Sequence, residues 1–237
     1  MIDVYGMSSP NVLKIVVALE ELGLEYSFHH IDIVAGEQYE PAFVALNPMS
    51  KVPVIVDHQG IDGERYTVFE SGAILIYLAE KAGKLIPQEP RARMDTIQWL
   101  VLQIANVGPT FGQHNHFLRF APPGNDYAAS RYRTLAGRVY DTLDKRLEVS
   151  TYLAGEDYTI ADIATYPWAA MYHEAHGMRW DDHPHLRRWC DLIAQRPAVI
   201  KSIAIHDEIT ANDPALRPDR SPDGVDRLFG RGAYARK

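Results

Sequence analysis

The stretch KVPVIVD, residues 51–57, restricts the possible folds of this chain more than any other segment. Its alternating valine and isoleucine residues predict a strand, yet Pro53 stands at the start of that pattern. Proline has no amide hydrogen to donate to a sheet ladder. It therefore occurs in strands at an edge, at a bulge or after a cis peptide bond.

The segments around Pro53 predict a small α/β domain over residues 1–83. Ser9 has the character of a helix N-cap, and Pro10 suits the first helical position. The predicted order is β-α-β-α-β-β-α, with strands over 2–5, 26–33, 52–57 and 65–69 and helices over 10–22, 41–47 and 70–83. A proline that opens the third strand of such a unit is the thioredoxin-like arrangement. There a cis peptide bond before Pro53 would leave the main chain of Val52 able to pair with an extended peptide.

The pattern changes to helices alone after a linker over residues 84–91. Helices are predicted over 92–117 (interrupted at Gly108-Pro109), 126–149, 159–175, 184–195 and 197–205. Thr159 and Asp162 have the spacing of a capping box at the start of one of them. We therefore expect an all-helical domain over 92–205, followed by a C-terminal extension over 206–237.

Two interpretations of that extension remain open. It contains three prolines and few periodic apolar residues, which is typical of a partly disordered tail. Alternatively it is an arm that lies across its own core or a partner subunit. Its apolar anchors would then be Leu216, Leu228, Phe229 and Tyr234.

Composition and charge exclude several classes of partner. The formal net charge is −7, which argues against an electrostatic hold on nucleic acid or on an anionic membrane. No apolar run approaches the roughly 18 residues of a membrane-spanning helix, and the first residues lack a signal-peptide pattern. The single cysteine, Cys190, suits a reducing compartment. We expect a cytoplasmic protein.

Two polar segments stand where helices begin, and both have the chemistry of binding sites. Ser9 and Asn11 follow the first strand, where a helix N-terminus favours an anion. Glu70 and Ser71 begin another helix and combine an acid with an anion site. Such a pair suits an α-amino acid, which carries both charges. A plain N-cap is the alternative for Ser71.

Four segments together resemble the cytosolic glutathione transferases: SSPNVLKIVVALEELGLEY, NPMSKVPVIVD, FESGAILIYLAEK and YTIADIATYPW. The resemblance extends over residues 1–205 and follows that family's two-domain layout. GQHNHF (112–117), RYR (131–133) and KRLE (145–148) are similar to the bacterial nu class, which is related to the fungal prion-like nitrogen regulators.

The resemblance implies a binding site for the tripeptide glutathione. Val52, through its main chain and beside Pro53, would hold the cysteinyl part. Glu70 and Ser71 would hold the γ-glutamyl end. Gln38 and Lys51 would lie near the glycine end.

The resemblance also implies a catalytic pair, Ser9 and Asn11, beside the glutathione thiol. Nu-class enzymes usually have threonine where this chain has Ser9, so the hydroxyl is kept on a less restricted side chain. A second glutathione, or the disulfide, can share the cleft in that class. Its binding arginine corresponds to Arg131.

These implications predict a homodimeric, glutathione-dependent disulfide-bond reductase that uses two bound glutathiones and no metal. One alternative is a serine-type glutathione transferase or peroxidase, or a thioether-forming lyase, acting on electrophiles. Another is a non-catalytic regulatory module with the same fold, although an Asn/Gln-rich arm is absent from the sequence.

Other candidate residues are weaker. Tyr5 lies inside the first strand rather than in the loop, and Cys190 is more typical of packing than of catalysis. His114 and His116 are two residues apart, so they would not share one helix face as metal ligands do. They would line the interdomain cleft or pack at the edge of the core.

Overall fold

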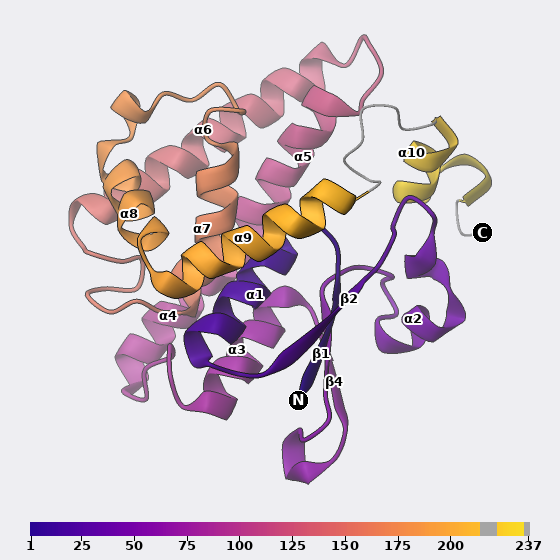
Figure 1. Ribbon diagram of the computed structural model, residues 1–237. Coiled ribbons are helices and arrows are strands. Elements are labelled where there is room, and N and C mark those ends of the chain that lie inside the picture. Colours follow the sequence, from indigo (N-terminus) through magenta and orange to yellow (C-terminus); the bar gives the residue numbers. More distant parts are fainter. Residues whose placement is uncertain (214–221, 235–237) are drawn as a thin grey trace. The chain divides into compact units, whose positions relative to one another are not determined.

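The computed structural model describes residues 1–213 and 222–234. The chain divides into two compact units (Figure 1). The first, the sheet unit, contains residues 1–77 and the described part of 201–237. The second, the helical unit, contains residues 78–200. No helix among the described residues has both the length and the apolar character needed to cross a membrane.

A mixed sheet of four strands forms the centre of the sheet unit. The strands are β1 (Ile2–Gly6), β2 (Tyr26–His30), β3 (Val54–Asp57) and β4 (Tyr66–Phe69), in the spatial order β2-β1-β3-β4. β2 is parallel to β1, whereas β3 is antiparallel to both β1 and β4. Every residue of β3 is buried, as expected for a central strand covered on both faces.

Three helices cover this sheet: α1 (Pro10–Leu22), α2 (Pro41–Leu46) and α3 (Ser71–Ala82). Figure 1 shows α1 and α3 on one side of the strands and α2 on the other. The Ser9 side chain caps α1, and Gly23 ends it with a left-handed backbone (φ 66°). The Val52–Pro53 peptide bond is cis. The predicted thioredoxin-like order of elements, including cis-Pro53, is therefore confirmed.

The helical unit contains α4 (Pro90–Leu102), α5 (Gly108–Arg119), α6 (Asp126–Glu148), α7 (Ile160–Tyr172) and α8 (Pro184–Ala194). A π-helical segment, Gln103–Val107, joins α4 to α5. The sequence predicted an interruption at Gly108-Pro109, but the chain stays helical there. Pro109 cannot donate a main-chain hydrogen bond. The π-helical turn before it accommodates this missing bond, so the chain stays helical from α4 into α5.

The predicted capping box is confirmed at the start of α7. The Asp162 carboxylate accepts from the Thr159 N–H at 3.0 Å, and the Thr159 hydroxyl accepts from the Ala161 N–H at 3.3 Å. Asp162 also accepts from the Trp189 indole at 2.9 Å, which joins α7 to α8. This cluster fixes the start of the most buried helix in the unit.

Helix α9 (Pro197–Asn212) was predicted to end at residue 205, and this prediction was wrong. The added turns carry His206 and lead to Asp213, which are 8% and 2% exposed. Polar residues at a helix end usually face water. Here both are buried because they find partners in the sheet unit, as described below.

The described part of the C-terminal extension contacts the segment that follows β2. It forms α10 (Pro222–Leu228) and a short 3-10 turn, Gly232–Tyr234. In Figure 1, α10 (yellow) lies beside the chain that leads into α2. The Arg227 guanidinium donates to the carbonyl oxygens of Val34 and Ala35, each at 3.3 Å. The hydrogen bonds of Arg227 make this contact polar, whereas the sequence predicted apolar anchors. Of those anchors, Phe229 is 37% exposed, and Leu216 lies outside the described residues.

Candidate active site

Strand register brings several predicted site segments to one end of the sheet. In β1 and β3, Tyr5 pairs with Val54, so the loop after β1 lies beside the residues that precede β3. In β3 and β4, Val54 pairs with Phe69, so the start of α3 lies beside the same residues. Neighbouring strands are only about 4.8 Å apart. Three groups therefore meet at adjacent strand ends: Ser9 with Asn11 (the Ser9 corner), Val52-Pro53 and Glu70-Ser71.

Ser9 is held at this end as the N-cap of α1. Its backbone is extended (φ −155°, ψ 155°), and its Oγ accepts the N–H of Val12 at 3.3 Å. A hydroxyl that accepts through its oxygen keeps its hydrogen as a donor. Ser9 and Asn11 are half-buried, so both remain accessible to a ligand.

Ser8 has a different environment from Ser9, which the sequence did not reveal. Ser8 is 7% exposed, and its Oγ lies 2.6 Å from Thr210 Oγ1 and 3.2 Å from His206 Nε2. Its N–H donates to Asp213 Oδ2 at 2.9 Å. Ser8 thus faces the interior and contacts α9, which leaves Ser9 as the serine available at the corner.

The main chain of Val52 lies just outside the sheet ladder, because β3 begins at Val54. None of the described residues hydrogen-bonds to the Val52 main chain. An extended peptide would satisfy these polar groups by pairing with them. Lys51 beside it is exposed, and its carbonyl oxygen accepts from the Asn47 side-chain amide at 2.7 Å.

Glu70 and Ser71 form a second corner at the start of α3. Glu70 has a left-handed backbone (φ 67°), which is costly for a residue with a Cβ and is often found at binding sites. Its side chain is exposed. Ser71 is the first residue of α3 and 8% exposed, and its hydroxyl forms no hydrogen bond with any described residue.

Lys14 was missed by the sequence analysis. It lies on α1 three residues after Asn11 and is fully buried. Burial lowers the pKa of Lys14 to about 7, and the charge of Glu70 partly offsets that effect. The sequence contains a signal for this residue: Lys14 is the one charged residue in the apolar stretch NVLKIVVAL, and a charge on an apolar helix face needs a partner.

Gln38, expected near the glycine end of glutathione, is almost fully buried. It is 3% exposed, and its Nε2 donates to the Ile33 carbonyl oxygen at 3.1 Å. Its Oε1 is buried without a hydrogen-bond partner among the described residues. Through this hydrogen bond Gln38 holds the segment that follows β2. That segment begins after His30, which pairs with Gly6 of β1.

Arg131 belongs to the helical unit and lies on the exposed side of α6. It lines a shallow concavity of about 250 Å³ together with Tyr127, Ser130, Thr134 and Arg138. Its part in a second glutathione site stays a prediction.

Two weaker candidates have other roles in the structure. The Tyr5 ring stacks on His29 of β2, with centroids 4.9 Å apart. Cys190 is 6% exposed in α8, and burial raises the pKa of its thiol well above the ordinary value. Because a thiolate is the reactive form, Cys190 has the character of a packing residue.

The histidines of the helical unit form a buried aromatic cluster. His114 is 1% exposed and its ring lies 4.6 Å from that of His176, so it packs in the core. His176 Nε2 donates to Asn115 Oδ1 at 3.2 Å, which leaves Nδ1 of the neutral ring to accept from the Tyr140 hydroxyl at 2.9 Å. Among the described residues, no group of three or more potential ligands is placed to hold a metal ion.

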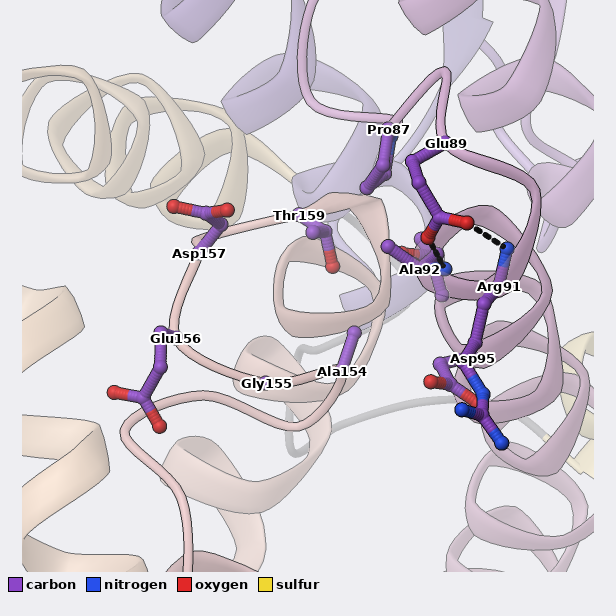
Figure 2. Close-up of a pocket in the computed structure, with 11 residues that line it drawn as sticks. Pro87, Glu89, Arg91, Ala92, Asp95, Ala154, Gly155, Glu156, Asp157 and Thr159 are labelled. Atoms are coloured by element: carbon purple, nitrogen blue, oxygen red, sulfur yellow. Dashed lines mark hydrogen bonds between the residues drawn. The ribbon is translucent and has the colours of Figure 1, made fainter.

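The helical unit also has a surface pocket of about 230 Å³ between the start of α4 and residues 154–159 (Figure 2). Both carboxylate oxygens of Glu89 point at main-chain amides in that view, and accept from Arg91 N–H at 3.0 Å and Ala92 N–H at 2.7 Å. Glu89 is thus occupied as the N-cap of α4. The pocket offers exposed acids and no reactive group.

Comparisons with known proteins match both parts of the chain to one family. The glutathione S-transferase N-terminal domain family matches residues 2–80, and the C-terminal domain family matches residues 114–197. The chain is 44% identical over 201 residues to the disulfide-bond oxidoreductase YfcG of Escherichia coli K12, which covers 84% of this chain and 92% of YfcG.

Solved structures give the same result. A glutathione transferase family member from Pseudomonas fluorescens pf-5, with two glutathione bound, has 40% identity and a TM-score of 0.81 over 85% of this chain and 92% of that one. A glutathione transferase from Pseudomonas putida, with one glutathione disulfide bound per subunit, has 36% identity and a TM-score of 0.82 over 86% and 91%. The chain belongs to the glutathione S-transferase family, as its motifs predicted.

Proposed function

We propose that this protein is a glutathione-dependent disulfide-bond reductase. The observation that carries the proposal is the convergence of three groups at one end of the sheet: the Ser9 corner, the Val52 main chain, to which no described residue hydrogen-bonds, and the Glu70-Ser71 corner. The name of YfcG and the glutathione bound in the two Pseudomonas structures support it.

Each corner suits one part of glutathione. The cysteinyl residue pairs with the main chain of Val52. The γ-glutamyl carboxylate binds the Ser71 hydroxyl and the N-terminus of α3, and Glu70 takes its ammonium group. Lys51 and the Gln38 segment lie toward the glycine end. Glu70 would pair with the ammonium group at one end of the tripeptide, and Lys51 with the glycine carboxylate at the other. Held at both ends, the tripeptide would direct its thiol toward Ser9.

The Ser9 corner then stabilises the thiolate. A free thiol has a pKa of about 8.5, and lowering it by two units requires roughly 2.7 kcal/mol. A charge-assisted hydrogen bond from the Ser9 hydroxyl, with Asn11 and the positive end of α1, is sufficient. The protein supplies no nucleophile, because the substrate carries the sulfur.

The reaction then needs two glutathiones. The first thiolate attacks a substrate disulfide, forms a mixed disulfide and releases one substrate thiolate, which takes up a proton. The second glutathione, held by Arg131, attacks the mixed disulfide and releases the other substrate thiol. The products are glutathione disulfide and two thiols. Because the reaction consumes reduced glutathione, it suits the cytoplasm.

Turnover of hydroxyethyl disulfide and of chlorodinitrobenzene tests this proposal. A disulfide reductase reduces the first far faster than it conjugates the second. A transferase acting on electrophiles shows the reverse, and a regulatory module acts on neither. Cys190→Ser should keep nearly full disulfide reductase activity, since burial keeps that thiol protonated. Loss of turnover in this variant would point to a protein mixed disulfide instead.

We also propose that the protein is a homodimer whose two-fold interface lies on α4, α5 and α6. Val101 is 55% exposed on α4. A groove of about 290 Å³ is lined by Leu102, Leu135, Val139 and neighbouring residues of these helices. An isologous dimer buries such a self-complementary apolar strip. A monomer mass by light scattering at micromolar concentration would refute this assembly.

A further inference from the structure

The end of α9 contacts the loop that carries the candidate thiolate corner. Asp213 Oδ2 accepts the N–H of Ser8 at 2.9 Å, and the Ser8 hydroxyl lies 2.6 Å from that of Thr210. His206 Nε2 lies 3.2 Å from the same hydroxyl. Both polar groups of Ser8 named here are thus held by residues about 200 positions away in the sequence.

The Asp213 carboxylate is an unusual group to find here. It is 2% exposed, and His30 Nε2 lies 3.7 Å from it at the end of β2. A buried carboxylate is costly unless it is hydrogen-bonded or paired with a positive charge. Asp213 thus joins the ends of two neighbouring parallel strands, β1 through Ser8 and β2 through His30.

The neighbouring hydroxyl groups extend this contact. Thr210 lies one helical turn after His206 on α9, so both side chains reach Ser8 from the same helix face. Burial lowers the pKa of His206, although the charges of Asp207 and Asp213 oppose that effect. A neutral imidazole next to two hydroxyls can accept from one of them.

Ser8 directly precedes Ser9, so its main chain determines where the Ser9 hydroxyl points. A catalytic donor must be held within about half an ångström of its productive position. The family match ends at residue 197, before this part of α9. His206, Thr210 and Asp213 therefore lie beyond the residues that the C-terminal domain family matches.

We propose that the end of α9 positions the thiolate corner: Asp213, with Thr210 and His206, holds the main chain of Ser8 so that the Ser9 hydroxyl is directed at the glutathione sulfur. The three are positioning residues and touch no reacting atom. The proposal rests on the proposed function for the role of the corner, but the contact itself is testable without it.

Amide hydrogen exchange at Ser8 tests the contact directly. In Asp213→Ala the Ser8 N–H loses its acceptor, and we expect it to exchange at least about tenfold faster than in the parent protein. Asp213→Asn keeps an acceptor oxygen and should lie between the two. Asn212→Ala is the matched control, because that exposed side chain donates to the Glu208 carbonyl of its own helix and forms no hydrogen bond with Ser8. Equal exchange in Asp213→Ala and the parent overturns the proposal.

Kinetics test the consequence for the corner. In Asp213→Ala, kcat for disulfide reduction should fall about tenfold while KM for glutathione changes less than about twofold. The pH profile should shift toward the pKa of free glutathione, and Asp213→Asn should restore most of kcat. A purely structural role would lower the folded fraction and leave kcat per folded molecule and the pH profile unchanged, which would overturn the proposal.

Thr210→Val gives an independent reading if Asp213→Ala fails to fold, since it removes a hydroxyl at nearly constant volume. Faster Ser8 exchange in Thr210→Val supports the proposal, and parent-like exchange contradicts it. If the parent protein reduces no disulfide, the proposed function fails, whereas the exchange measurements still decide whether α9 positions Ser8.

Discussion

Two buried carboxylates, Asp162 in the helical unit and Asp213 in the sheet unit, differ in how far along the sequence their partners lie. Asp162 is fully buried and accepts hydrogen bonds from Leu153 N–H at 2.9 Å, Thr159 N–H at 3.0 Å and the Trp189 indole at 2.9 Å. Asp213 is 2% exposed and accepts from Ser8, 205 positions away in the sequence. One closes a local structure, and the other joins distant parts of the chain.

The difference separates a residue that maintains the fold from one that contacts the candidate site. The partners of Asp162 lie within 27 positions, in the helical unit alone. Removing it should cost stability and leave glutathione binding by folded molecules unchanged. Residues at the sheet end should behave in the opposite way. Variants at both kinds of residue can test this division.

Asp162→Ala should lower the free energy of unfolding by roughly 3–5 kcal/mol, because it leaves several buried donors without an acceptor. Urea titration measures the loss. Asp157→Ala, at an exposed position nearby, is the control and should change little. A loss of less than about 1 kcal/mol would mean that Asp162 does not hold the start of α7.

Acid should weaken the helical unit through its buried histidines. Burial lowers the pKa of His176 to about 3 and that of His173 to about 4. Below pH 6.5 the unfolded chain therefore binds more protons than the folded protein. The contribution of these histidines to the free energy of unfolding is fully present above pH 6.5 and is lost as the pH falls toward 4. The loss is roughly 2.5 kcal/mol for each histidine by pH 4.5.

The variant His176→Asn removes one of these titrations, so its stability should fall less steeply between pH 6.5 and 4.5. Comparing the slopes, rather than the stabilities, makes the result independent of the hydrogen bonds that the variant loses. Parallel curves for the two proteins would contradict the assignment to His176.

Ser71→Ala should weaken glutathione binding by roughly 1–3 kcal/mol and change stability little, the reverse of Asp162→Ala. The hydroxyl forms no hydrogen bond with any described residue, so a bound ligand could use it as a partner without breaking an existing bond. Calorimetry gives the affinity, with Ser27→Ala on β2 as the control. Unchanged affinity would remove Ser71 from the site.

Arg227→Lys should have the smallest effect and a local one. The guanidinium donates to two carbonyl oxygens after β2, and an ammonium group cannot match that geometry. Amide exchange over residues 34–39 should become a few-fold faster, with the rest of the sheet unit unchanged. Arg231→Lys, whose partner is Asp226, is the control. Uniformly unchanged exchange would show that α10 does not restrain this segment.

Elements with local sequence signals could be predicted without coordinates. Pro53 with its flanking strand pattern, the Ser9 cap with Gly23, and the Thr159-Asp162 box each specify a structure within a few residues. The resemblance to a known family supplied the order of the domains and the residues of the candidate site. Such features follow from residue type and spacing, so they can be recognised without coordinates.

Which polar residues are buried, and what they contact, depends on how distant parts of the chain pack together. Lys14, Gln38 and Asp213 have side chains that usually face water, yet each is 3% exposed or less. The different roles of Ser8 and Ser9 depend on α9, whose contact with this loop joins positions about 200 residues apart. No local sequence pattern predicts such a pairing, because it forms only when residues near position 8 and residues 206–213 pack together in the folded sheet unit.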